Sequence, residues 1–137
     1  MPIDPQALQT MEASLQRLTS GPEFLDRFYE IFLNSSPKVK EKFAHTNFHK
    51  QKVALQGSLF GMLKYAHCGI GEQDDYLQDV AERHSKGSLD IGSELFDLWL
   101  DSLLTAVKEC DPEGNAEVLT AWEQVMSEGI RFFLARY

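Results

Sequence analysis

The sequence is poor in the residues that cross-link small proteins or bind polyanions. It has two cysteines, Cys68 and Cys110, which lie far apart and form no CxxC pair, so neither a disulfide framework nor a structural zinc site is indicated. Lysine and arginine total 13 against 21 aspartates and glutamates, a formal charge of -8. Because binding to nucleic acid or anionic lipid needs clustered cations, the overall composition argues against both partners.

Long hydrophobic runs are also missing. No apolar stretch approaches the roughly 20 residues of a membrane span, and the N-terminal MPIDPQALQT lacks a basic-then-apolar signal pattern. We therefore expect a cytoplasmic protein without a membrane partner. The length of 137 residues predicts one domain over residues 1–137. Since the sequence ends at Tyr137, we expect no flavin reductase domain.

Turn and cap residues divide the sequence into helical stretches, and nothing reads as a strand. Helix starts are indicated at Asp4-Pro5 and Ser36-Pro37. A long helix is predicted from about residue 49 to 66 and a shorter one over roughly 75–86. Asp90 is the expected cap of the next helix, which runs to about Cys110 before a break at Pro112 and a final helix. The pattern predicts an all-α domain.

Five features follow one another in a recognisable order. They are Tyr29 eight residues before Pro37, Phe43 six residues after that proline, Gln51 opening QKVALQGSL, His84 in LQDVAERHSKG, and Trp122 in NAEVLTAWEQV. Their order and spacing resemble the globin family, in particular bacterial single-domain haemoglobins and the haem domain of flavohaemoglobins. The resemblance covers nearly the whole chain and implies a globin fold of seven to eight helices around one haem pocket.

The resemblance implies that His84 is the axial ligand of the iron in haem b. An imidazole is a suitable ligand because it is neutral, basic and can be held in one orientation. Leu77, Val80 and Ala81 share its side of the predicted helix, which indicates a buried face. The backbone carbonyl near Val80, one turn earlier, is the expected acceptor for the other ring nitrogen.

On the opposite side of the haem, the resemblance implies that Tyr29 and Gln51 face the bound gas. A tyrosine hydroxyl and a glutamine amide can both donate hydrogen bonds to a partly negative ligand. Each bond of about 1 kcal/mol or more slows release, and about 1.4 kcal/mol multiplies affinity tenfold. Two donors therefore predict tight binding, suited to scavenging, sensing or redox chemistry more than to bulk delivery.

The register of the distal helix leaves an alternative, in which Lys50 or His49 lies over the iron. We favour Gln51 because Leu55, Leu59 and Met62 continue its face at helical spacing, as expected of residues that face the haem. The Lys50 register would instead present Ala54, Ser58 and Gly61, which would fill the cavity poorly. His49 as a sixth iron ligand is kept as the other alternative.

Four apolar side chains are expected to pack on the porphyrin and exclude water: Phe43, Leu55, Leu95 and Leu98. Arg83 and Lys86, on either side of the histidine, could pair with the haem propionates. Two positions depart from the flavohaemoglobin pattern, because Glu94 and Met126 stand where that family has tyrosines. A strongly electron-donating proximal side is therefore not expected.

The leading expectation is reversible binding of oxygen, nitric oxide or carbon monoxide at ferrous haem, by a monomer or weak homo-oligomer. The alternative is a haem enzyme, either a nitric oxide dioxygenase supplied with electrons by an external reductase or a peroxidase-type enzyme. A third hypothesis is a globin-shaped sensor or interaction module without haem. It ranks below the others because it predicts the loss of the candidate ligand His84, which is present.

Overall fold

The computed structural model describes residues 3–68, 75–85, 87 and 91–137, with the side chains of residues 68 and 75–77 left aside. Within these residues the chain forms seven α-helices and no strand. The helices are α1 (Pro5–Leu18), α2 (Glu23–Leu33), α3 (Pro37–Lys42), α4 (Phe48–Cys68), α5 (Asp75–His84), α6 (Ser93–Cys110) and α7 (Ala116–Ala135).

Side-chain caps fix the starts of three helices. The Asp4 carboxylate accepts from the backbone N–H of Gln6 at 2.9 Å, ahead of Pro5 at the first position of α1. Ser36 and Asn115 cap α3 and α7 in the same way. A capping side chain satisfies an N–H group that has no partner inside the helix, so these residues set where each helix begins. The two starts predicted from Asp4-Pro5 and Ser36-Pro37 are confirmed.

The predicted start of α6 was wrong. This helix begins at Ser93, after an extended Gly92 that provides no side-chain cap. Asp90, which lies outside the described residues, is therefore not its cap. The chain between α5 and α6 is instead tied to the site, because the Ile91 N–H donates to the His84 carbonyl at 2.9 Å.

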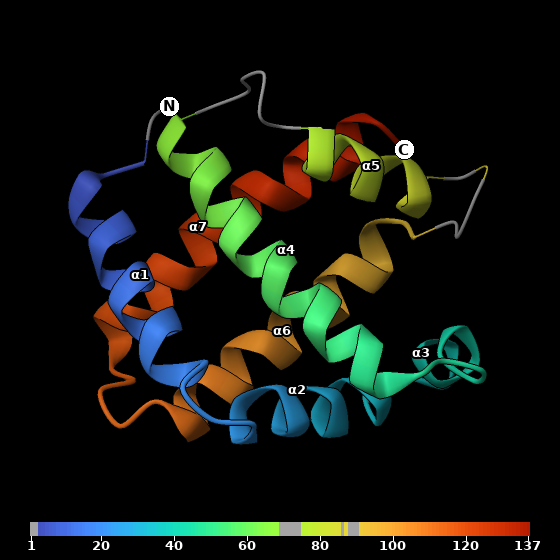
Figure 1. Ribbon diagram of the computed structural model, residues 1–137, viewed down its shortest axis with the longest axis horizontal. Coiled ribbons are helices and arrows are strands. Elements are labelled where there is room, and N and C mark those ends of the chain that lie inside the picture. Colours follow the sequence, from blue (N-terminus) through green and yellow to red (C-terminus); the bar gives the residue numbers. More distant parts are fainter. Residues whose placement is uncertain (1–2, 69–74, 86, 88–90) are drawn as a thin grey trace.

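Helix α7 lies at the centre of the arrangement and packs on α1, α4, α5 and α6. Helix α2 packs on α6, α3 and the first part of α4. Figure 1 shows α4 running across the face of the molecule, with α3 beside its N-terminal end. The inner face of α4 is thus opposed to the helices from both ends of the sequence, while its outer face is turned away from them.

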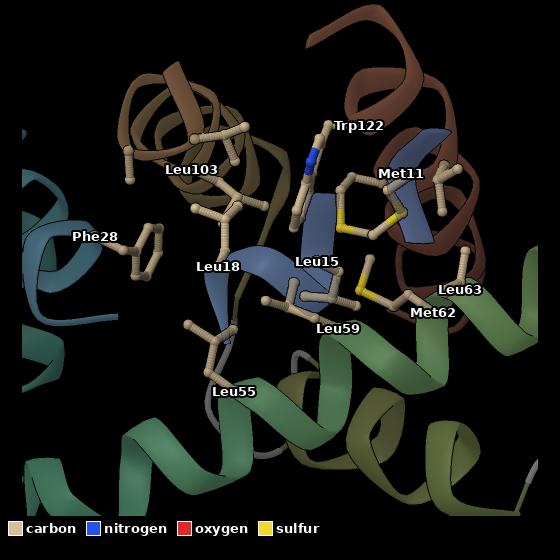
Figure 2. Packing of buried hydrophobic residues seen from close by; sticks show 14 of the residues in the cluster. Met11, Leu15, Leu18, Phe28, Leu55, Leu59, Met62, Leu63, Leu103 and Trp122 are labelled. Carbon is tan, nitrogen blue, oxygen red and sulfur yellow. The ribbon is translucent and has the colours of Figure 1, made fainter. Parts of the chain in front are cut away.

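The core lies where α1, α4, α6 and α7 meet. Figure 2 shows Leu55, Leu59 and Met62 of α4 directed towards the same cluster as Leu15 and Leu18 of α1. Burial of such side chains stabilises the fold by about 1.5–3 kcal/mol each relative to exposure. This packing holds the inner face of α4 in place beside the cavity described below.

One polar cluster is built into the core. The indole N–H of Trp122 donates to Ser14 Oγ at 2.9 Å, and the Ser14 hydroxyl donates to the buried carboxylate of Asp111 at 2.5 Å. Arg17 completes the cluster with hydrogen bonds of 3.0 and 2.9 Å to the two oxygens of Asp111. The cluster joins α1 to α7 and to the turn between α6 and α7, which lie about 100 residues later in the sequence.

Candidate functional site

A cavity of about 300 Å³ lies among α2, α3, α4, α5, α6 and α7. This volume falls in the range typical of pockets that hold small molecules. Most of its lining is apolar, from Phe32, Val39, Phe43, Ala54, Leu55, Met62, Val80, Ile91, Leu95, Phe96, Trp99 and Phe133. Its polar lining comes from Tyr29, Lys42, Thr46, Gln51, Ser58, Arg83 and His84. The cavity is therefore mainly hydrophobic, with a few polar side chains in its wall.

His84 is the only histidine among the described lining residues. Its Nδ1 atom lies 2.7 Å from the carbonyl oxygen of Val80, one turn earlier in α5, as expected. Burial lowers the pKa of His84, and the nearby Arg83 adds to this, against the opposing effect of the Val80 carbonyl. The neutral imidazole is favoured, with Nδ1–H donating to the carbonyl, so Nε2 is left with its lone pair.

Two phenylalanine rings hold the imidazole in orientation. The ring centroids of Phe96 and Phe133 lie 6.1 and 5.9 Å from that of His84, with interplanar angles of 25° and 10°. They come from α6 and α7, so three helices fix one side chain. A ring locked by packing and by a backbone hydrogen bond is preorganised to bind a metal.

Tyr29 projects from α2 on another part of the cavity wall and is only 4% exposed. The rings of Phe28, Phe43 and Phe48 surround it, with centroid distances of 4.9, 6.0 and 5.5 Å. Burial raises the pKa of Tyr29 to about 12, although a hydrogen bond with the side chain of Gln51 acts in the opposite direction. The hydroxyl is therefore a neutral donor in an apolar enclosure.

Gln51 lies in the first turns of α4 and lines the cavity, whereas His49 and Lys50 are exposed and do not line it. The helical-face argument for this register was only partly right. Leu55 and Met62 line the cavity, but Leu59 lies in the core instead. The lining residues Gln51, Ala54, Leu55, Ser58 and Met62 are spaced three or four residues apart, so a single face of α4 lines the cavity, and this face includes two residues that the Lys50 register was expected to present.

Three of the four predicted porphyrin contacts line the cavity, namely Phe43, Leu55 and Leu95. Leu98 does not, and packs half-buried against the hydrophobic core. Its neighbour Trp99 lines the cavity instead. On α6, the positions facing the cavity are Leu95, Phe96 and Trp99, at i, i+1 and i+4. The lining face therefore includes Leu95, as expected, but is turned from Leu98 towards Phe96 and Trp99.

Two cations border the cavity. Arg83 lines it, as the position beside His84 suggested, and Lys42 of α3 lines it as well. Lys86 lies outside the described residues. Sequence reasoning missed Lys42, and the one available signal was its position next to Phe43. These two cations could meet the acidic groups of an anionic ligand.

Other lining residues also escaped the sequence analysis. Trp99 of α6 and Phe133 of α7 face the cavity, and so does Ser58 of α4, which was expected there only in the alternative Lys50 register. Their helical periodicity fits an ordinary core equally well, so only the packing of the helices distinguishes them. The two departures from the flavohaemoglobin pattern lie elsewhere: Glu94 is exposed and paired with Lys38 at 3.1 Å, and Met126 is fully buried.

The helices enclose an apolar pocket between one oriented imidazole and the side chains of Tyr29 and Gln51. This all-helical arrangement is that of a haemoglobin-like protein. The sequence profile of the Globin family matches residues 26–131. The chain belongs to the globin family, and the predicted globin fold is confirmed.

Three relatives illustrate the match. A crystal structure from Pseudomonas aeruginosa, titled as that of a protein structurally highly homologous to a human hemoglobin, has a TM-score of 0.89 at 39% identity and covers 96% of this chain and 98% of its own. An uncharacterized globin-like protein of Aquifex aeolicus is 30% identical over 104 residues, with 76% of this chain and 71% of that protein covered. A flavohemoprotein of Oceanobacillus iheyensis is 27% identical over 125 residues.

The chain corresponds to only part of the flavohemoprotein. The match spans 89% of this chain but 30% of that relative. Family membership implies a haem and diatomic ligands in general terms. Among the residues that the structure describes, no helix is long and apolar enough to cross a membrane.

Proposed function

We propose that this globin holds one haem b through Nε2 of His84 and reversibly binds oxygen, or a similar diatomic gas, with high affinity. The observation that carries the proposal is the hydrogen bond of 2.7 Å between His84 Nδ1 and the Val80 carbonyl. It occupies one ring nitrogen and leaves the other as the ligand atom. This arrangement is usual for haem- and metal-ligating histidines.

The lining of the cavity fits a haem. The porphyrin is a flat, largely apolar group with two carboxylates, and the cavity offers apolar side chains with Lys42 and Arg83 at its border. When bound, haem would supply the iron to which a small gas binds. The apolar walls, including Phe43 and Leu95, exclude water from the pocket and strengthen the polar contacts inside it.

Tyr29 and Gln51 are the donors available to a polar gas ligand. The pKa of about 12 keeps the Tyr29 hydroxyl protonated at any physiological pH, so it can always donate. The enclosing rings hold its position and limit competing water. Two preorganised donors slow release of the ligand, which favours a role in scavenging or sensing over bulk delivery.

The test is an absorption spectrum of the purified chain reconstituted with haem, recorded in the ferric state, after reduction, and with carbon monoxide. We expect stoichiometric haem and a Soret band that shifts at each step. The variant His84→Ala should lose stable haem retention, because no other histidine lines the described part of the cavity.

The matched control is His67→Ala, which removes an exposed histidine of α4. It should retain haem as the unaltered chain does. Helical circular dichroism of both apoproteins separates loss of the ligand from loss of the fold. Normal haem content in a folded His84→Ala variant would overturn the proposal.

A further inference from the structure

The overall acidity of the chain conceals a basic region. Residues 38–67 contain six lysines, no arginine and one acidic residue, a formal charge of +5, whereas the remaining sequence has 7 lysines and arginines against 20 acidic residues, or -13. Three of the four histidines also lie in this region. In the fold it corresponds to α3, the corner after it and nearly all of α4. Figure 1 shows α3 at the N-terminal end of α4, which runs across the face of the molecule.

The outer face of α4 carries a continuous row of exposed side chains, which we name the α4 stripe. It consists of Lys50, Val53, Gly57, Phe60, Lys64 and His67, all exposed and spaced three or four residues apart. Val53 and Phe60 are 65% and 38% exposed, and the one other large hydrophobic residue so exposed in the described chain is Tyr137. The stripe thus has an apolar centre between two cationic ends.

Among the residues that the structure describes, the two lysines of the stripe have no acidic partner. Helix α4 contains no aspartate or glutamate, and within the described residues Lys50 and Lys64 form no ion pair. Their neighbours differ, since Lys52 pairs with Asp26 at 2.6 Å and Lys38 pairs with Glu94. No carboxylate in the described part of the chain therefore neutralises these two lysines, and their charge is available to a partner.

The stripe also borders the opening of the haem pocket. Exposed Ala54, next to Val53, lines the cavity together with Ser58 one turn later. Exposed Lys42 lines it from α3. A molecule seated on the α4 stripe would therefore cover part of this opening.

We propose that the α4 stripe is a docking surface for an acidic protein partner, contacted through a helix with apolar residues in the middle and carboxylates at both ends. Lys50 and Lys64 are 14 residues apart, about 21 Å along the helix, which sets the spacing of the partner's carboxylates. Aromatic and aliphatic side chains ringed by charges are typical of the centre and rim of a protein interface. Gly57, without a side chain, allows the partner helix to approach closely between Val53 and Phe60.

Charge selects a protein over the other anionic macromolecules. An extended polyanion, such as a nucleic acid or a lipid surface, would reach past the stripe and meet the remaining sequence, whose formal charge is -13. A compact acidic protein can contact the stripe alone. A second copy seated through the same stripe is less suited, because the lysines of one copy, Lys50 and Lys64, would face those of the other.

The test measures binding of a fluorescent helical peptide of the length of α4, with glutamates at both ends and leucine and alanine between. Its matched control has lysines in place of the glutamates. We expect the glutamate peptide alone to bind, more tightly at about 10 mM than at about 150 mM salt, because screening weakens exposed charge pairs. In nuclear magnetic resonance spectra, the amide shifts that move should be those of α4.

Two variants and one control locate the site. The double variant Lys50→Glu with Lys64→Glu should weaken binding about tenfold or more, and Val53→Ser with Phe60→Ser should weaken it as well. The control, Lys108→Glu with Arg131→Glu, makes the same change of charge on exposed positions of α6 and α7 and should leave binding unchanged.

Several results would overturn the proposal. If the control variant weakened peptide binding equally, net charge alone would explain the binding. If the Val53 and Phe60 changes had no effect on peptide binding, the apolar centre of the stripe would not contact the peptide. Tighter binding of phosphatidylglycerol vesicles or single-stranded DNA would assign the stripe to another ligand class. Concentration-dependent dimers lost in the Lys50 and Lys64 variant would assign it to a second copy. The measurement works on the apoprotein, so it stands whether or not haem binds.

Discussion

Gln51 lines the cavity together with Tyr29, and its side chain lowers the pKa of the Tyr29 hydroxyl against the effect of burial. The two residues come from α2 and α4, and three phenylalanine rings enclose the tyrosine. These rings hold the tyrosine in place at the cavity wall. A gas ligand would meet a preorganised pair of donors, whose effects on binding should be coupled.

Replacing Tyr29 with phenylalanine removes one donor and keeps the ring. In the haem-loaded globin we expect the oxygen dissociation rate to rise about tenfold, the scale of one hydrogen bond of about 1.4 kcal/mol. Gln51→Leu should also raise this rate, and the effect of the double variant should deviate from the sum of the two single effects because the two side chains interact. Stopped-flow displacement of oxygen by carbon monoxide measures these rates.

The control is Tyr65→Phe, which removes the hydroxyl of a half-buried tyrosine of α4 that packs on Phe132 outside the cavity lining. Its oxygen dissociation rate should equal that of the unaltered globin. An unchanged rate in Tyr29→Phe would assign Tyr29 to helix packing alone.

The buried phenol of Tyr29 should also be visible in an alkaline titration of the apoprotein. Its pKa is about 12 in the folded state against 10.0 for an ordinary tyrosine, so between these values the unfolded chain loses this proton and the folded chain keeps it. This tyrosine therefore favours unfolding increasingly as the pH rises from about 10 to about 12. Tyrosinate absorbance should show a late transition that is missing in Tyr29→Phe, and the variant should lose stability less steeply in this range. A complete titration near 10 in the folded chain would contradict the assignment.

The sequence predicted the helices best where caps and proline mark them. Asp4 and Ser36 each provide a side-chain oxygen for a free N–H, so α1 and α3 begin where expected. Helix α6 has no such capping side chain, because the residue at its N-cap is Gly92, which has no side-chain oxygen. An aspartate nearby, Asp90, was then the more plausible but wrong cap.

The candidate site was predicted in outline from residues with a fixed chemical role. His84 and Tyr29 stand out by residue type and spacing, and the structure places both on the cavity. The side chains that complete the lining depend on how helices rotate against each other. Leu98 and Trp99 differ by one position on α6, yet only the second faces the cavity. A helical repeat does not resolve such a difference without knowledge of the neighbouring helices.

Asp111 should be a main contributor to stability. Its carboxylate is fully buried and accepts from Ser14, Arg17 and the backbone N–H of Glu113. We expect Asp111→Asn to lower the free energy of unfolding by about 3 kcal/mol, the scale for breaking a buried charge pair. Ser14→Ala should cost about 1–2 kcal/mol, since it leaves the Trp122 indole N–H without an acceptor.

The effect of Asp111 should depend on pH. Burial raises the pKa of this carboxyl, but the hydrogen bonds from Arg17, Ser14 and Glu113 outweigh burial and hold it below the ordinary 3.8. The stabilisation is therefore present above about pH 4 and lost as the pH falls through the lowered folded-state pKa. Urea unfolding of the unaltered protein and of Asp111→Asn should show a large difference in the free energy of unfolding at about pH 7 and a smaller difference at about pH 3. A difference independent of pH would mean that the charge of Asp111 is not involved.

At the crossing of α7 and α4, the side chain of Met62 leaves no room for a side chain at Gly129. A Cβ atom on Gly129 would lie 2.2 Å from Cε and 3.0 Å from Cγ of Met62, so the methionine would have to move. Met62 lines the cavity, and its displacement should disturb bound haem as well as the core. We expect Gly129→Ala to cost about 1–3 kcal/mol, the scale of overpacking, despite the better helix propensity of alanine.

Shortening Met62 in the Gly129→Ala variant tests whether the two side chains are energetically coupled. Met62→Ala alone should also destabilise the fold, by creating a cavity, but Gly129→Ala combined with Met62→Ala should cost less than the sum of the two. Urea unfolding of the four chains in the cycle gives the coupling energy. Additive costs would show that the methionine side chain adapts to the new methyl group without strain, and that this close approach does not constrain the crossing of α4 and α7.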